Sequence, residues 1–548
     1  MSLDWENGSQ AARRLGIVIA GSLAEGLEVR LDSAASVEDM AVGRYVVIAG
    51  QKRKFFGMIT DVELAASSAQ ITVSPPDISD PFIAEVIAGT STFGVLKIQP
   101  MLSVSQDAGE PAIQPVKTVP SHFSPVSEAE EEDVFDVFGR EDGMHFYIGK
   151  PLDMDTKVCL NLPRLVERSS GVFGKSGTGK TFLTRLLLIG IAQKDAAVNL
   201  VFDMHNEYGE AGTWEGGKTV KGLRPLFQSR VSIFTLDPVS SRARGAAADF
   251  EVEIGYDQVE PQDIAMLQEA LDLSSPQVET VYQLGRVFGD NRWLAEFLSI
   301  EQGPDLEDLA RRLGLNLGTL QVLRRKIETH LVSLPFLKPQ VLDNSVKRIL
   351  ECLDRGIHVV LEFGRHNKLD AYILVANVLT RRIHEQYMIR KEEAMGKQAM
   401  EPRPLVITIE EAHKFLNPRV AEFTIFGTIA REMRKYNVTL LVVDQRPSSI
   451  ADEIMSQIGT RITCLLDDEK DISAVLTGIP GADKLRNVLA KLDSKQQALI
   501  LGHAVPMPVV IRTREYGTPE SYKELLFAEG AKLREKAMRD LEELFEGP

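Results

Sequence analysis

The stretch from residue 169 to residue 187, SSGVFGKSGTGKTFLTRLL, constrains this chain more than any other part of its sequence. Gly174, Gly179, Lys180 and Thr181 stand at the spacing G-x-x-x-x-G-K-[ST], after an apolar pair and before apolar residues at helical spacing. A strand, a glycine-rich loop and a helix in this order form a phosphate-binding loop, whose backbone N–H groups and helix N-terminus hold a polyphosphate. The stretch therefore predicts a nucleoside-triphosphate site on an α/β core.

Two side chains of this loop have expected roles in the chemistry. Lys180 is expected to reach the β- and γ-phosphates, and Thr181 is expected to ligate Mg²⁺. The predicted nucleotide-binding residues of the loop are Gly174, Lys175, Ser176, Gly177, Thr178, Gly179, Lys180, Thr181 and Phe182.

The composition limits the setting of the protein. A chain of 548 residues is long enough for about three or four domains. Its three cysteines are far apart, which argues against a disulfide framework and a zinc knuckle. No apolar run approaches the roughly 20 residues of a membrane span, and the first residues lack a signal-peptide core. We therefore expect a cytoplasmic protein. Its net charge of −16 argues against a broad basic surface but is compatible with a narrow basic channel.

The first 105 residues read as an N-terminal β-barrel. Short β-rich runs, LGIVIAG, LEVRL, RYVVIAG, FFGMITDVEL and AQITVS, are separated by glycines and small polar residues. The barrel could serve for docking or could simply cap the larger domain. Residues 106–145 contain four spaced prolines and then a run of acidic residues, which predicts an extended connector. This acidic segment could be regulatory or merely solvated.

An α/β core is expected in two parts, residues 146–255 and residues 354–515. A helical insertion at 256–353 separates the two parts, and a C-terminal helix over 516–548 follows the second. In the first part, the buried-strand pattern 198–202 precedes the polar residues Asp203, His205, Glu207 and Tyr208, at a sheet edge where ligands bind. The glycine-rich piece 209–222 is expected to be a loop. A basic cluster at 324–326 could be a solvated helix face or a DNA contact. Arg365, His366 and Lys368 could line a pore or a solvated turn.

The second part of the core contains an acidic motif. The apolar run 405–409 leads directly into Glu410 and Glu411, the Walker B pattern. We assign Glu410 to the metal shell and Glu411 to activation of the attacking water. Gln445 follows the strand pattern 438–443 and is placed to sense the γ-phosphate.

Taken together, these motifs resemble a known family. GVFGKSGTGKT, FDMHNEYG, ITIEEAH, AREMRK and VVDQRPSSI occur in the order found in the HerA/FtsK-type ATPases, and the likeness is greatest to the HerA-like group with its domain of unknown function 87. The N-terminal barrel resembles that family's HAS-barrel. The resemblance implies a RecA-like P-loop NTPase core that binds ATP and Mg²⁺ between the subunits of a homo-hexameric ring.

The resemblance also implies a function and further site residues. It implies translocation or unwinding of double-stranded DNA, together with a nuclease partner of the NurA type or a defence effector, in DNA end processing or anti-phage defence. By the same likeness, Asp203 and Glu207 lie near the catalytic centre. Arg431 and Arg434 match the motif that supplies an arginine finger to the adjacent subunit, and which of the two does so is left open. One alternative is an ATP-gated scaffold that organises an effector without moving DNA. The other is a pumping ATPase of a secretion or conjugation system.

Overall fold

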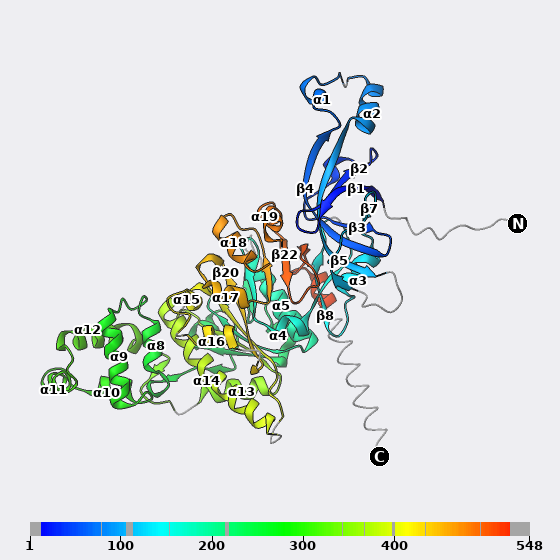
Figure 1. Cartoon of the computed structure of the whole chain (residues 1–548). Coiled ribbons are helices and arrows are strands. Elements are labelled where there is room, and N and C mark those ends of the chain that lie inside the picture. The colour runs from blue at the N-terminus through cyan, green and yellow to red at the C-terminus, as the bar shows by residue number, and fades with distance from the viewer. Residues whose placement is uncertain are drawn as a thin grey trace, which may run out of the picture. The chain divides into compact units, whose positions relative to one another are not determined.

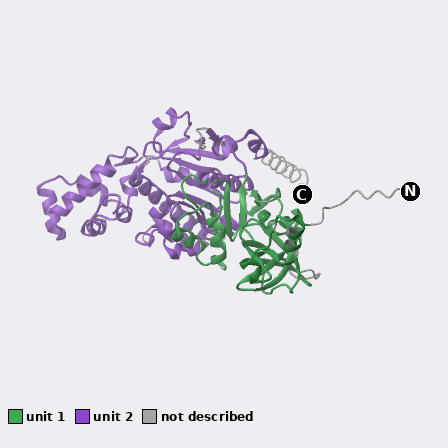
Figure 2. Cartoon of the chain, turned by 90° about the horizontal axis from the view of Figure 1, so that it is seen from above, with its two compact units in different colours: residues 1–161, 173–179, 460–514 green, residues 162–172, 180–459, 515–548 purple. Residues whose placement is uncertain are grey.

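The computed structural model (Figure 1) describes most of the chain. The described residues are 13–77, 79–105, 113–152, 154–213, 219–341, 344–366, 368–396, 400–422, 424–432, 435–479, 481–493 and 495–525. The chain divides into two compact units, coloured separately in Figure 2: residues 1–161, 173–179 and 460–514, and residues 162–172, 180–459 and 515–548.

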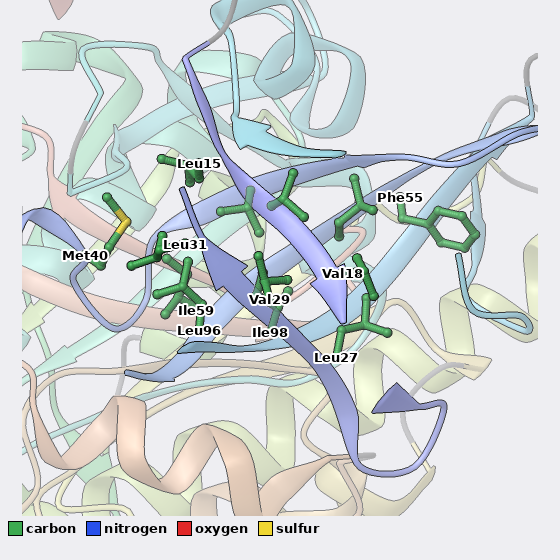
Figure 3. Packing of buried hydrophobic residues seen from close by; sticks show 13 residues of the cluster. Leu15, Val18, Leu27, Val29, Leu31, Met40, Phe55, Ile59, Leu96 and Ile98 are labelled. Carbon is green, nitrogen blue, oxygen red and sulfur yellow. The ribbon is translucent and has the colours of Figure 1, made fainter. Parts of the chain in front are cut away.

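The first unit contains a closed antiparallel barrel, as the sequence predicts. Its strands follow one another in the order β2-β1-β7-β3-β4-β5, and a β2–β5 pairing closes the ring. Alternate residues point inward, so that side chains such as Leu15, Val29 and Leu96 form one buried cluster (Figure 3). The strands are β1 (Arg14–Ser22), β2 (Gly26–Leu31), β3 (Tyr45–Ala49), β4 (Arg53–Ala66), β5 (Thr92–Ser105), β6 (Ile113–Pro115) and β7 (Pro125–Glu128).

One of the β-rich runs is not a strand. AQITVS was expected to be extended, but Ala69–Val73 form helix α1, and α2 (Pro81–Thr90) follows before β5. The reason is local capping. The Ser68 side chain accepts from the backbone N–H of Gln70, and Asp80 accepts from that of Phe82, so each begins a helix.

The prediction of an extended connector is wrong for three segments of its described part, β6, β7 and the helix α3 (Glu131–Phe138). β6 pairs with β5, and β7 pairs with β1 and β3 inside the barrel sheet. The acidic run instead begins α3, where Glu130 and Asp133 form a capping box. Asp133 also bonds Lys54, and Glu128 lies 3.0 Å from Arg44. The carboxylates therefore cap a helix and pair with barrel cations. Residues 106–112 lie outside the described part.

The first unit also contains an antiparallel group of strands that come from two distant segments of the chain, residues 145–161 and 460–513. Its order is β21-β22-β23-β8-β9. The Tyr45 hydroxyl of the barrel donates to the carbonyl of Pro508, just before β23, at 2.9 Å. The elements are β8 (His145–Lys150), β9 (Val158–Asn161), β21 (Thr460–Thr463), β22 (Gln497–Gly502), β23 (Val509–Thr513), α18 (Glu469–Leu476) and α19 (Ala482–Ala490).

The second unit is built on a parallel sheet in the order β15-β14-β18-β11-β19-β20-β10. The sheet confirms the P-loop NTPase core, and its central strands are buried along their whole length, as expected for a parallel sheet covered on both faces. The strands are β10 (Ser170–Phe173), β11 (Val198–Asp203), β14 (Val231–Thr235), β15 (Phe250–Glu251), β18 (His358–Glu362), β19 (Leu405–Glu410) and β20 (Val438–Asp444). The helices include α4 (Leu162–Glu167), α5 (Lys180–Lys194), α13 (Ser345–Asp354), α14 (Leu369–Met395), α15 (His413–Leu416), α16 (Ile425–Glu432) and α17 (Asp452–Gln457).

The helical insertion is present, and a short parallel pair joins its two ends: β16 (Ile254–Gly255) with β17 (Leu337–Lys338). Within the predicted range 256–353, however, α13 contacts β18 and α14 of the core. Arg324 is buried and donates to main-chain carbonyls, including that of Leu298 at 2.8 Å, so it is part of the packing. The helices of the insertion are α8 (Pro261–Met266), α9 (Ser275–Phe288), α10 (Trp293–Ser299), α11 (Pro304–Leu313) and α12 (Leu317–Ile327).

Two smaller expectations differ from the structure or extend beyond it. The piece 209–222, expected to be a loop, contains a hairpin of β12 (Ala211–Thr213) and β13 (Thr219–Lys221). The predicted C-terminal helix is seen at 519–525, and residues 526–548 lie outside the described part. Within the described part of the chain, no helix has both the length and the apolar character needed to cross a bilayer.

Replacing Arg381 by alanine is expected to destabilise the second unit by about 3–5 kcal/mol, because it leaves buried carboxylates without their cation. Arg381 of α14 is buried and donates to Asp263 at 2.8 Å, and it also bonds Glu260, at the start of the insertion. Urea unfolding measures the effect. Arg390→Ala, which removes a surface pair with Asp354, is the control and is expected to cost at most about 1 kcal/mol. Equal effects of the two substitutions would contradict the prediction.

Candidate nucleotide-binding site

The phosphate-binding loop has the backbone that its glycines predict. Gly174 has φ of +154°, and a Cβ there would meet the Cβ of Cys464 and the hydroxyl of Thr178, each at 2.8 Å. Gly179 has φ of +96°, a conformation that side-chain-bearing residues rarely adopt. The Thr178 hydroxyl donates to the carbonyl of Lys175 at 2.8 Å, closing the loop on itself. Lys175, Ser176, Gly177 and Gly179 are exposed, so the loop is open to a ligand.

The helix that follows the loop carries the lysine and the threonine. α5 begins at Lys180, so Lys180, Thr181 and Phe182 form its first turn, and all three are partly buried. The Phe182 ring packs edge-on against Tyr516, with the ring centroids 5.5 Å apart. Tyr516 is fully buried, so the C-terminal segment supports the first turn of α5.

Glu410, the last residue of β19, is almost completely buried. The Tyr208 hydroxyl donates to its Oε1 at 2.7 Å, and the Tyr372 hydroxyl donates to its carbonyl at 3.2 Å and accepts from its N–H at 3.0 Å. Within the described residues, Oε2 has no hydrogen-bond partner. Burial raises the pKa of Glu410 to about 7, while the Tyr208 hydrogen bond and the Lys180 charge act in the opposite direction. Glu410 therefore lies within electrostatic reach of Lys180.

Glu411 lies in a different environment from its neighbour. Its φ of +49° is left-handed, so the chain leaves the strand geometry at this residue. Gln445, just past β20, donates from Nε2 to Glu411 Oε1 at 3.1 Å. The His413 ring lies 3.6 Å from Glu411 and is held by buried Asp444, whose carboxylate is 3.0 Å from Nδ1. The structure thus brings Glu411 and Gln445 together and gives Glu410 and Glu411 different partners.

Asp203 shapes the turn that follows β11. Its carboxylate accepts from the backbone N–H groups of Glu207 and Tyr208, each at 2.8 Å, and of Gly209 at 3.3 Å. Burial raises the pKa of Asp203 to about 7, against the effect of these hydrogen bonds. Both of its oxygens are occupied, so Asp203 supports the turn rather than presenting an oxygen to a nucleotide. Glu207 is half-buried, and its charge contributes to the raised pKa of Glu410.

Of the two candidate arginine fingers, the structure describes only Arg431. Arg431 lies near the end of α16 and is partly exposed, and within the described part of the chain it makes one long hydrogen bond, of 3.4 Å, to the carbonyl of Ala421. Arg434 lies outside the described residues. Among the pore candidates, Arg365 is paired with buried Asp237 at 2.7 Å.

Sequence reasoning missed the part that two tyrosines play. Tyr208 stands out in the sequence as a polar residue after β11, but its bond to Glu410 spans about 200 positions of the chain. Tyr372 lies in the amphipathic pattern of α14, where an inward-facing tyrosine reads as core. The sequence does contain one signal for Tyr208: a tyrosine that lies close after a strand whose C-terminal end carries acidic residues.

A model of the central domain of helicase HerA matches residues 146–383, and a model of the HAS barrel domain matches residues 15–110. Residues 15–110 and 146–383 of the chain are therefore HerA-like. HerA-like relatives include the DNA double-strand break repair helicase HerA of Saccharolobus solfataricus, 23% identical over 86% of this chain and 87% of that protein. The Sulfurisphaera tokodaii protein of the same name is 21% identical over 92% of this chain and 93% of its own length.

Solved structures similar to this HerA-like chain include VirB4 of Thermoanaerobacter pseudethanolicus. That match has a TM-score of 0.44 and 14% identity, and covers 70% of this chain and 99% of the other. The plasmid coupling protein TrwB in complex with ADP and Mg²⁺ matches with a TM-score of 0.43 and 13% identity, over 70% of this chain and 98% of that one. As a HerA-like P-loop protein, the chain is an ATP hydrolase.

Proposed function

We propose that this HerA-like chain is a Mg²⁺-dependent ATPase that assembles into a homo-hexameric ring and translocates or unwinds double-stranded DNA. The supporting observation is the combination of an intact phosphate-binding loop with the Glu410, Glu411 and Gln445 group, in a chain similar over most of its length to DNA repair helicases. A partner nuclease or defence effector, as in DNA end processing or anti-phage defence, is part of the proposal.

The residues present fit a nucleotide-bound Mg²⁺. Oε2 of Glu410 is a buried carboxylate oxygen without a protein partner in the described part of the chain, and Lys180 of the same unit acts on its charge. No group of three or more His, Cys, Asp or Glu residues forms a metal cluster in that part. This agrees with Mg²⁺, which is held by one or two protein oxygens together with phosphates and water. Thr181 and Glu410 would hold the ion, which supplies charge neutralisation at the phosphates.

Each protein side chain of the site has a separate proposed role in hydrolysis. We assign to Glu411 the acceptance of a proton from the attacking water, because Tyr208 bonds the other carboxylate, that of Glu410, and Glu411 bonds Gln445 instead. Gln445 bonds one Glu411 oxygen, so it can orient the water and respond to the γ-phosphate. Lys180 would neutralise the β- and γ-phosphates. A finger from a neighbouring subunit, Arg431 or Arg434, would complete the site.

The ATPase rate with and without linear duplex DNA tests the DNA partner. We expect stimulation at low salt that weakens steeply between about 50 and 200 mM salt, because phosphate contacts release counterions. Lys180→Ala is the control that removes all specific turnover. A rate that does not respond to DNA at any salt would contradict the proposal, and would favour the ATP-gated scaffold.

A further inference from the structure

Three elements of the second unit surround Glu410, and one of them bonds its carboxylate. Tyr208, from the turn after β11, bonds its Oε1. Tyr372, from the first turn of α14, bonds its main chain on both sides. Arg185, from the phosphate-loop helix α5, lies over the Tyr208 ring, 5.8 Å from the centroid. Hydrogen bonds from Tyr208 and Tyr372 therefore fix the orientation of Glu410 at the end of β19.

Tyr208 itself is restrained by burial and by hydrogen bonds to its backbone and to the neighbouring residue. It is fully buried, and its backbone N–H is fixed by the Asp203 carboxylate at 2.8 Å. Arg185 donates to the carbonyl of Glu207 at 2.7 Å, which ties the residue before Tyr208 to α5. The backbone, the ring and the neighbouring turn of Tyr208 are thus all restrained, so its hydroxyl points to one place.

The consequence is an asymmetric carboxylate. Oε1 of Glu410 accepts the hydrogen bond of the Tyr208 phenol, whereas Oε2 is buried and has no hydrogen-bond partner among the described residues. A buried carboxylate oxygen without a partner costs free energy unless something binds it. The Tyr208 hydrogen bond accounts for Oε1, so Oε2 is the carboxylate oxygen that a ligand can bind.

We propose that Tyr208 is a positioning residue, which fixes the Glu410 carboxylate so that Oε2 is the oxygen presented to the nucleotide-bound divalent cation. Groups that orient a metal ligand in this way affect metal affinity about 10- to 100-fold when they are removed. Because Arg185 joins Tyr208 to α5, the phosphate-loop helix and the acidic strand are aligned through the same side chain. This inference rests on the ATP site of the proposed function and does not depend on the DNA partner.

Tyr208→Phe tests the inference, because it removes the hydroxyl and keeps the ring. A fluorescent non-hydrolysable ATP analogue is bound to wild type and variant in EDTA and in a titration of MgCl₂. We expect analogue affinity in EDTA to be unchanged, and the Mg²⁺ concentration for half-maximal response to rise about 10-fold. In turnover, we expect the rise in the Mg²⁺ requirement to exceed any fall in kcat. Glu410→Gln should itself raise the Mg²⁺ requirement, and adding Tyr208→Phe to it should raise it little further.

The control is Tyr387→Phe. Tyr387 is also a buried tyrosine, on α14 and about 22 Å further along the helix than Tyr372 at 1.5 Å per residue. Its loss should leave the Mg²⁺ titration unchanged. If folded Tyr208→Phe protein, checked by thermal unfolding, shows the same Mg²⁺ titration as the wild-type protein, the inference about Tyr208 is overturned and the proposed Mg²⁺ site is not. Equal weakening in EDTA and MgCl₂ would also overturn the inference. If Mg²⁺ does not change the binding of the analogue to the wild-type protein, both this inference and the proposed Mg²⁺ site are overturned.

Discussion

Glu411→Gln is expected to bind ATP like the wild-type protein and to hydrolyse it about 10²- to 10⁴-fold more slowly, the usual contribution of a general base. Glutamine keeps the shape of the side chain and an acceptor for the Gln445 amide, which lies 3.1 Å from Oε1. It cannot accept the proton of the attacking water. Turnover under saturating ATP and Mg²⁺ measures the loss, and equilibrium binding of the same nucleotide measures what is retained.

Glu453→Gln is the matched control, since Glu453 is an exposed glutamate in the first turn of α17. It should hydrolyse ATP at the wild-type rate. A Glu411→Gln protein that retained more than a tenth of wild-type turnover would remove Glu411 from the role of base. Glu410, whose Oε1 is already bonded by Tyr208, would then be tested next by the same substitution.

Arg431→Ala is expected to lower ATP turnover by about 10³- to 10⁵-fold if Arg431 is the finger, since a guanidinium stabilises the charge that develops on the γ-phosphoryl group. Among the described residues Arg431 makes one hydrogen bond, of 3.4 Å, to the carbonyl of Ala421. Its guanidinium is therefore not committed to the fold in the way that Arg324 and Arg381 are.

Mixing variants tests whether the arginine acts in trans. Arg431→Ala subunits keep Glu411, and Glu411→Gln subunits keep Arg431, so a mixed ring would contain complete sites where the two kinds meet. We expect activity to return in the mixture and in neither protein alone. Arg419→Ala, which removes an exposed arginine paired with Glu269, is the control with unchanged activity. Full activity of Arg431→Ala with loss in Arg434→Ala would instead assign the finger to Arg434.

The parts of the site that depend on a few adjacent residues could be predicted from the sequence. The phosphate loop and β19 carry their information in a few adjacent residues: glycines with positive φ, and an apolar run that ends in two glutamates. Long-range partners could not be predicted. Tyr372 and its partner Glu410 are 38 positions apart in the chain, and no pattern within α14 marks this tyrosine as different from the others. The left-handed backbone at Glu411 was equally hidden, because a carboxylate after a strand reads as a continuation of the strand.

Two errors in the fold have a common cause. The composition of AQITVS and of the acidic run near residue 130 favours extended chain, whereas capping residues start a helix in both segments. Ser68 turns a β-rich run into α1, and Glu130 with Asp133 turns a run of like charges into the start of α3. At a helix N-terminus, carboxylates are stabilised by the helix dipole rather than repelled from one another.

The position of β7 in the barrel has a consequence for how the chain can fold as it is made. β1 and β3 do not pair with each other; each pairs with β7, whose last residue is Glu128. During synthesis both strands must wait, with one edge unpaired, for more than seventy further residues after β3. Unpaired edges are where nascent chains associate wrongly. A fragment ending at residue 105 would retain these open edges, and the shortest fragment that closes the barrel extends through Glu128.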